Sequence, residues 1–367
     1  MQKWTKERVW DWYNKEPWIR GCNFMGSDCA NRIDQWQEEG FEQRLIVADR
    51  ELKLAADTGL NAIRILPEYA VYREDPAGFY QRFERYLDTA AKYGIRAMLT
   101  LGNDCLLPYD DPNSHLKPGP QHYDWGYHGG RKRSQHSSLN AEPGWCFLDD
   151  PEERDKVYQW VGDMITRYRT DERVVVWDLY NEPGNAHREE ISIPHVKKYF
   201  EIAREVNPMQ PITSAVHSMN GDPNQKLPEV QRFILEESDI VSYHNYGSYM
   251  ENIRILRLLK RHGRPIMNTE WLARMQHNTV EEMFPLFYLE KIGCFNWGLV
   301  AGLYQTYEPW EAIWENYERG RCRDIDFKVW FHDLYRPNLR PYDPHEIELM
   351  RELCSMADED YRQINRK

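Results

Sequence analysis

The chain alternates short apolar runs with longer amphipathic stretches along almost its whole length. The apolar runs have the length and side-chain types of buried strands and lie at residues 18–24, 61–66, 95–101, 174–180, 211–216, 239–246, 265–270 and 294–300. Apolar residues recur with helical spacing at residues 49–59, 79–94, 151–168, 195–206, 250–263, 280–293 and 344–356. The pattern predicts strands that alternate with helices.

Eight predicted strands with no hairpin signal between them indicate parallel strands joined by crossover helices. A closed (β/α)8 barrel satisfies this count. A doubly wound open sheet is the alternative, but it normally carries a glycine-rich phosphate loop after its first strand, and the segment GCNFMG is a poor match. We therefore expect an α/β fold, a (β/α)8 TIM barrel, with residues 1–367 as a single domain.

Two connections are much longer than an ordinary barrel loop. Residues 102–150 follow the third strand, residues 302–343 follow the eighth, and both are rich in Pro, Trp, Tyr and His. Barrel enzymes build their sites at the C-terminal ends of the strands, so we expect both loops at this mouth. The first should close one end of a cleft. Residues 1–17 are an N-terminal extension that we expect to cap the opposite end.

Charge and composition limit the classes of partner. The chain has 47 basic and 59 acidic residues, a net charge of −12, and no long block of like charge. Neither nucleic acid nor an anionic membrane is therefore expected as a partner. Aromatic residues make up 13% of the chain, and such rings suit the C–H faces of sugars. A carbohydrate substrate fits this composition.

Targeting and cofactor signals are weak. No apolar run is long enough to span a bilayer, and the start MQKWTKERVW lacks the apolar centre of a signal peptide, so the chain is either cytoplasmic or exported with its signal peptide removed. The seven cysteines form no C-x-x-C pair and are expected as free thiols. The spacing of His115, His122, His128 and His136 matches no metal-ligand pattern. We expect no metal and no cofactor, and assign these histidines to a substrate cleft.

Two strand ends carry a glutamate. The run VVVWDLY ends abruptly in Asn181, Glu182, Pro183 and Gly184, and the run PIMNTEW places Glu270 at the end of the seventh strand. A lone glutamate at a strand end could cap a helix or pair with an arginine. Two carboxylates that face each other across a barrel mouth are the machinery of glycoside hydrolysis.

Strand alternation places further polar residues inside the barrel mouth. The inward phase includes Arg64 on the second strand, His244 and Tyr246 on the sixth, and Trp297 on the eighth. A cation and a phenol that donate to a carboxylate hold it ionised as a nucleophile, whereas a glutamate near another carboxylate keeps its proton longer. The indole offers a platform for a sugar ring.

The segments WDLYNEP, YHNY, MNTEW and FNWG resemble the retaining glycoside hydrolases of clan A, most of all the cellulase-like enzymes of family 5. The resemblance extends from residue 18 to about residue 353. It implies that Glu182 is the acid/base and Glu270 the nucleophile.

The resemblance also implies roles for neighbouring residues. Asn181 would bind the 2-hydroxyl of the sugar, and His244 would support the acid/base. Tyr246 and Arg64 would hold the nucleophile. Trp297 would form the floor of the glycone site.

One segment departs from the family pattern. Family 5 enzymes often carry a histidine near the ends of early strands that contacts the sugar, whereas the third strand here ends in Gly102, Asn103, Asp104 and Cys105. Asn103 and Asp104 are the candidates for a substrate-binding or supporting role there. The sugar contacts of the family do not transfer to this position.

The sequence thus predicts a retaining glycoside hydrolase that cleaves a β-linked sugar by double displacement, acting on short oligosaccharides or glycosides. The alternatives are a catalytically silent carbohydrate-binding barrel and a transglycosylase with the same residues. The sugar, the linkage and the oligomeric state do not follow from the sequence.

Overall fold

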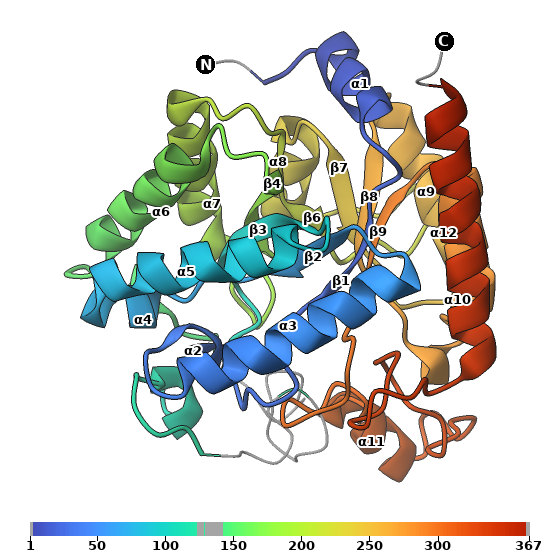
Figure 1. Ribbon diagram of the computed structural model, residues 1–367. Helices are drawn as coiled ribbons and strands as arrows, with labels where there is room; N and C mark the ends of the chain where they lie inside the picture. Colours follow the sequence, from blue (N-terminus) through green and yellow to red (C-terminus); the bar gives the residue numbers. More distant parts are fainter. Residues whose placement is uncertain (1–2, 123–127, 129–141, 365–367) are drawn as a thin grey trace.

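The computed structural model describes residues 3–122, 128 and 142–364, and within them nine parallel strands form a barrel surrounded by helices (Figure 1). The strands are β1 (Arg20–Asn23), β2 (Ala62–Ile65), β3 (Arg96–Asn103), β4 (Val174–Asn181), β5 (Ile212–Thr213), β6 (Ala215–Val216), β7 (Val241–His244), β8 (Ile266–Trp271) and β9 (Gly293–Trp297).

The barrel closes through its fifth predicted strand. The strand order is β5-β4-β3-β2-β1-β9-β8-β7-β6, so β5 and β6 stand at its two ends. These two short strands are the halves of the run at residues 211–216, separated only by Ser214. One half pairs with β4 and the other with β7. The predicted (β/α)8 TIM barrel is therefore confirmed.

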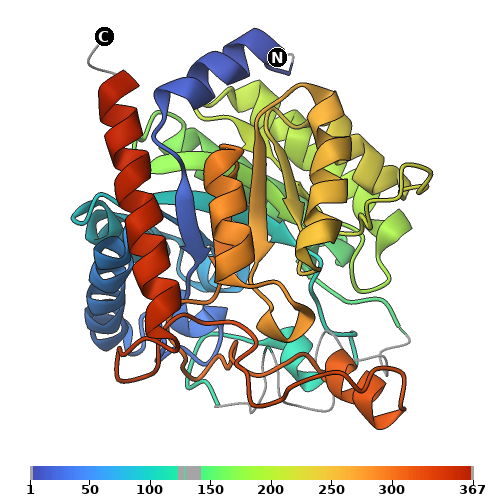
Figure 2. The same ribbon diagram turned by 90° about the vertical axis from the view of Figure 1, so that its right-hand side faces the viewer.

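The helices pack outside the barrel, between and over the strands (Figure 2). They are α1 (Lys6–Lys15), α2 (Arg32–Trp36), α3 (Phe41–Thr58), α4 (Tyr69–Glu74), α5 (Pro76–Ala91), α6 (Arg154–Tyr168), α7 (Glu189–Val206), α8 (Glu229–Glu237), α9 (Tyr249–Leu259), α10 (Val280–Leu289), α11 (Glu311–Glu318) and α12 (Pro344–Ile364). Short 3-10 helices are η1 (Pro112–His115), η2 (Phe147–Asp149), η3 (Lys260–His262) and η4 (Arg274–Gln276).

The helices differ from the prediction in several places: α3 and α7 begin earlier, α12 ends later, and the sequence pattern predicted none of α1, α2, α4, α8 and α11. α3 begins well before residue 49, because Phe41 and Val47 lie on the same buried face as Leu52. α7 begins before Pro194, which lies inside the helix. α8 was missed, although its Val230 is buried like the core residues of the longer helices.

The N-terminal segment closes one end of the barrel. In Figure 1, α1 crosses the end at which the strands begin. Its residues Val9 and Tyr13 belong to a buried cluster with residues of the barrel interior, namely Ala62, Met98, Val175, Val176, Met267 and Phe295. This apolar plug leaves the opposite end, where the strands finish, for polar side chains.

The described parts of the two long connections lie at that opposite end (Figures 1 and 2). The connection after β3 contributes η1 and η2, and the connection after β9 contributes α11. Among the described residues, no helix combines the length and the apolar character that a membrane span requires.

Candidate active site

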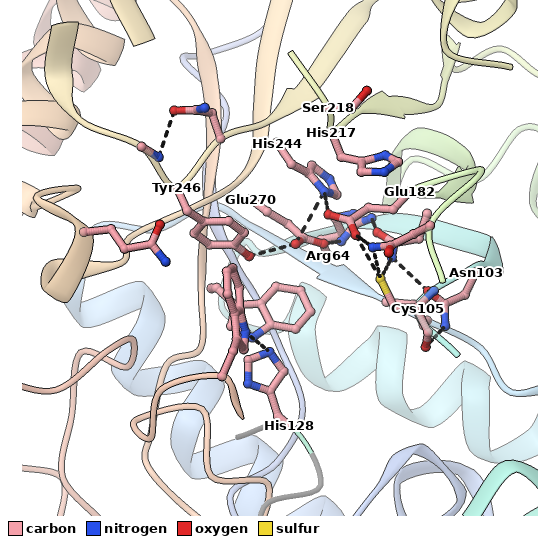
Figure 3. Close-up of a pocket in the computed structure, with 18 of the residues that line it drawn as sticks. Arg64, Asn103, Cys105, His128, Glu182, His217, Ser218, His244, Tyr246 and Glu270 are labelled. Carbon is pink, nitrogen blue, oxygen red and sulfur yellow. Dashed lines mark hydrogen bonds and ion pairs between the residues drawn. The ribbon is translucent and has the colours of Figure 1, made fainter. Parts of the chain in front are cut away.

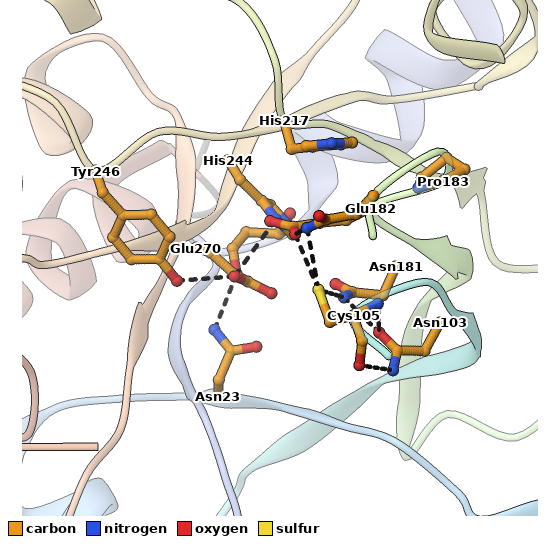
Figure 4. A network of polar contacts seen from close by, with 12 residues as sticks. Asn23, Asn103, Cys105, Asn181, Glu182, Pro183, His217, His244, Tyr246 and Glu270 are labelled. Atoms are coloured by element: carbon orange, nitrogen blue, oxygen red, sulfur yellow. Dashed lines mark hydrogen bonds and ion pairs between the residues drawn. The ribbon is translucent and has the colours of Figure 1, made fainter. Parts of the chain in front are cut away.

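Glu182 directly follows β4 on a tight turn. Its φ is 45°, in the left-handed region that residues other than glycine rarely adopt, and Gly184 has a φ of 92°. Such backbone conformations cost energy and cluster at functional sites. The turn aims the Glu182 carboxylate over the mouth of the barrel, toward Glu270 (Figure 4).

Glu270 lies near the end of β8 and is held by two donors. Arg64 Nη1 lies 2.8 Å from Oε1, and the Tyr246 hydroxyl donates to Oε2 over 2.8 Å. The buried guanidinium of Arg64 also donates to Asp178 over 2.9 and 2.7 Å and to Asn23 over 2.7 Å. Because these acceptors lie on separate strands, the barrel itself fixes the Arg64 guanidinium beside Glu270.

Glu182 has a different set of partners. His244 Nδ1 lies 2.7 Å from its Oε1. The Cys105 thiol and the Asn185 amide donate to its Oε2 over 3.0 and 2.5 Å. The same His244 nitrogen lies 3.4 Å from Oε2 of Glu270, so the imidazole stands between the two carboxylates (Figure 3).

The two glutamates lie close together. One carboxylate oxygen of Glu182, one of Glu270 and a ring nitrogen of His244 all lie within 4.8 Å of one another. Glycosidases that retain configuration hold their carboxyl groups about 5–5.5 Å apart, whereas inverting enzymes need about 6.5–9.5 Å to admit a water molecule. The observed spacing agrees with the retaining arrangement.

The same three residues are also the group, among those described, whose atoms lie close enough together to hold a metal ion. Arg64 already places a positive charge on Glu270 at 2.8 Å. A second cation there would be repelled by the guanidinium. The arrangement therefore suits proton transfer and nucleophilic attack better than metal coordination.

The two carboxyl groups differ in their pKa. Burial raises the pKa of Glu270 above its ordinary value, against the charges of His244 and Arg64. Burial acts in the same direction on Glu182, but the hydrogen bond from His244 and the charges of His217 and His244 hold its pKa well below the ordinary value. This order is the reverse of the one expected for a protonated acid at Glu182 and an ionised nucleophile at Glu270.

The charge of His217 contributes to this order. Burial lowers the pKa of His217, so its positive charge is lost near neutral pH. Glu182 then loses one of the charges that lower its pKa, while Glu270 keeps the permanent charge of Arg64. Two carboxylates this close share one proton, and both of these effects favour Glu182 as its carrier.

The site opens into a pocket of about 410 Å³ lined by both glutamates. One wall is aromatic and includes Trp297, at the end of β9, and Trp310. The ring of His128, from the connection after β3, stacks on Trp297 with centroids 5.3 Å apart and planes at 29°. The Trp310 indole donates to His128 Nε2 over 3.4 Å. The two long connections thus meet at this wall.

A family model joins this geometry to known proteins. The model of cellulase, glycosyl hydrolase family 5, matches residues 35–301. The chain belongs to glycosyl hydrolase family 5. Members of this family are retaining glycosidases that act on β-linked sugars. No curated protein sequence matches the chain significantly.

Solved structures share the fold at low sequence identity. An exo-β-1,4-mannosidase from Opitutaceae bacterium strain TAV5 is 14% identical with a TM-score of 0.53, and the match covers 92% of this chain and 60% of the mannosidase. A family 5 protein from Streptomyces cattleya in complex with GlcNAc is 11% identical with a TM-score of 0.56, covering 94% and 80%. An endo-1,4-β-D-mannanase from Thermotoga petrophila is 15% identical with a TM-score of 0.53, covering 91% and 99%.

In the segment that departs from the family 5 pattern, Asn103 and Asp104 have different surroundings. Asn103 lines the pocket, and its Oδ1 accepts a 2.8 Å hydrogen bond from Asn181, whose own Oδ1 accepts from Arg64 over 2.5 Å. Asp104 is fully buried and does not line the pocket. Its carboxylate accepts from the backbone N–H of Gly184 over 2.7 Å, and so supports the turn that carries Glu182.

The three described histidines of the connection after β3 have separate surroundings. His115 contacts the Tyr109 carbonyl oxygen over 2.8 Å, His122 is exposed, and His128 faces the pocket wall. His136 lies outside the described residues. Of the three described, His128 lines the pocket.

Sequence reasoning missed several residues that contact or neighbour the glutamates. These are Asn23, Cys105, Asp178, Asn185 and His217. Two of them could have been identified from their positions in the sequence. Cys105 lies two positions beyond Asn103, and His217 directly follows β6, as Glu182 directly follows β4.

Proposed function

We propose that this protein is a retaining glycoside hydrolase that cleaves a β-linked sugar by double displacement. Glu270 attacks the anomeric carbon while Glu182 gives its proton to the glycosidic oxygen, so that the bond to the leaving group breaks and a glycosyl ester forms. Glu182 then takes a proton from water, the water attacks the same carbon, and the ester bond to Glu270 breaks. The released sugar keeps the β configuration.

The spacing of the two carboxylates carries this proposal. Oxygens of Glu182 and Glu270 lie within 4.8 Å, which is less than the separation of about 6.5–9.5 Å by which inverting enzymes admit a water molecule. Direct attack by Glu270 is the reaction that this spacing supports.

The partners of Glu270 support its role as the nucleophile. Arg64 and the Tyr246 hydroxyl each donate to one of its oxygens over 2.8 Å. Both bonds stabilise the ionised form, which is the form that attacks. They also orient the carboxylate before the substrate binds, which lowers the entropic cost of reaction.

The aromatic wall supports a short substrate. His128, Trp297 and Trp310 close one side of the pocket and leave a volume of about 410 Å³. Aromatic faces bind the C–H faces of sugar rings. A closed end beside the glycone favours removal of a terminal sugar over cleavage inside a long polymer.

The experiment is a panel of aryl β-glycosides and β-linked oligosaccharides, with the first product followed by proton NMR. Release of the β anomer first, which later mutarotates, is the expected result. Release of the α anomer first would contradict double displacement. Binding without turnover would identify a carbohydrate-binding barrel, and longer oligosaccharides among the products would identify a transglycosylase.

A further inference from the structure

A second polar group lies beside Glu182 and takes no part in the reaction proposed above. His217 and Ser218 directly follow β6 and line the same pocket. In Figure 3 both lie on the side of Glu182 away from His128. Because His128 stacks on Trp297, the proposed glycone floor, these two residues face the opposite end of the pocket.

The hydrogen bonds of Gln231 fix the tautomer of His217. The Gln231 side-chain oxygen accepts from the backbone N–H of His217 over 3.1 Å, so its amide nitrogen must point the other way. That nitrogen donates to the Pro183 carbonyl oxygen over 2.8 Å and lies 3.0 Å from His217 Nδ1. If the amide were flipped, its nitrogen would face the backbone N–H of His217 and its oxygen would face the Pro183 carbonyl oxygen, so neither pair could form a hydrogen bond. The amide nitrogen therefore donates to Nδ1 of His217.

An accepting Nδ1 leaves the proton of a neutral imidazole on Nε2. Burial lowers the pKa of His217, so this ring stays neutral near neutral pH. Its Nε2–H is therefore a donor of fixed direction. Gln231 is buried, which keeps water from competing for these bonds.

Ser218 adds a second polar atom at the same place. Its Oγ is buried and has no hydrogen-bond partner. Buried polar atoms without a partner are rare, because each costs about 1–3 kcal/mol. A hydroxyl of a bound ligand would satisfy both the serine and the imidazole N–H.

We propose that His217 and Ser218 bind hydroxyl groups of the leaving group, so that the aglycone is a second sugar and not an apolar alcohol. This inference rests on the proposed function, because it takes Glu182 as the group that protonates the leaving oxygen. Residues on the side of Glu182 away from the glycone floor lie where the leaving group would bind. The pocket volume of about 410 Å³ lies within the range of about 300–1,000 Å³ for sites of drug-sized ligands, which exceed one sugar ring.

The test compares two substrates with the same glycone. One is a β-linked disaccharide, and the other is a cyclohexyl β-glycoside, whose leaving group needs the proton of Glu182 as a sugar does but bears no free hydroxyl. His217→Phe and Ser218→Ala should each lower kcat/KM for the disaccharide about 5- to 10-fold, the loss expected for one hydrogen bond, and change kcat/KM for the cyclohexyl glycoside less than about 3-fold. Lys226→Ala, an exposed position on the same connection, is the control and should change neither.

Equal losses on both substrates would show that His217 serves the reaction centre, and no loss on either would show that it binds no aglycone; both overturn the inference. If the unaltered protein hydrolyses neither substrate, the proposed function fails, and calorimetric binding of the disaccharide decides the inference instead. Weaker binding by His217→Phe supports it, and unchanged binding overturns it. The ¹⁵N spectrum of His217 should show the Nε2–H tautomer at neutral pH, and the Nδ1–H tautomer would contradict the hydrogen-bond assignment.

Discussion

The thiol of Cys105 donates a hydrogen bond over 3.0 Å to Oε2 of Glu182. Burial, together with the charge of Glu182, raises the pKa of this thiol well above its ordinary value, so it keeps its proton. The amide nitrogens of Asn181 and Asn185 lie 3.4 Å from the same sulfur. Cys105 is thereby fixed as a donor to the proposed acid/base.

Removing this donor should change the acid/base and leave the nucleophile intact. In Cys105→Ala, the Glu182 carboxylate loses a hydrogen bond that lowers its pKa. The pKa of Glu182 should rise, so that the alkaline limb of kcat/KM moves to higher pH. Cys105→Ser retains a donor and is the matched control, with a smaller displacement. An alkaline limb that stays in place in Cys105→Ala would exclude this role.

The acid limb of the pH profile of kcat/KM should reflect the raised pKa of Glu270. Because burial raises that pKa, Glu270 takes up its proton above the ordinary value of 4.5 as the pH falls, and a protonated carboxyl group cannot attack. In the proposed mechanism Glu182 carries its proton on this limb, so it places no charge beside Glu270 there. In Glu182→Gln, with an aryl glycoside that needs no proton, the acid limb should therefore stay in place. A limb that moves to lower pH would show that Glu182 is ionised on it, which contradicts its role as the acid.

Asp104 should contribute to stability. Its buried carboxylate lies 2.9 Å from the Arg188 guanidinium and also accepts from the Tyr180 hydroxyl over 2.9 Å. Removal of one partner of a buried ion pair costs about 3–5 kcal/mol. Asp104→Ala should lower the free energy of unfolding in urea by that amount.

The control for this measurement is an exposed ion pair. Lys197 lies 3.0 Å from Glu229, with both side chains about half exposed or more. Exposed pairs contribute little to stability, so Lys197→Ala should have a small effect. If Asp104→Ala loses no more stability than Lys197→Ala, the support that we assign to Asp104 is wrong.

The barrel was predictable because its signals are local. An apolar run such as residues 174–180 has few alternatives to a buried strand, and its abrupt polar end places Glu182 at the mouth. Alternation along β2 likewise placed Arg64 inside. The fifth strand was harder to describe, since Ser214 interrupts it, and α8 was missed because it is short.

The contacts among site residues were less predictable, because they depend on pairs far apart in sequence. Asp104 looks like a site residue by position, yet it turns toward Arg188 and lies buried behind the mouth. The partnership of His217 with Gln231 depends on how the β6–α8 connection packs. No periodicity in the sequence encodes such a side-chain direction.

Azide rescue tests the division of labour between Glu182 and Glu270 most directly. Glu270→Gly should stop the first step for every substrate, and azide should then restore turnover by attacking from the vacated side to give an α-glycosyl azide. Glu182→Ala should spare the first step for activated aryl glycosides, and azide should attack the glycosyl ester to give a β-glycosyl azide. An α product from Glu182→Ala and a β product from Glu270→Gly would exchange the two roles, and unimpaired hydrolysis of both poor and activated glycosides by Glu182→Ala would show that Glu182 transfers no proton.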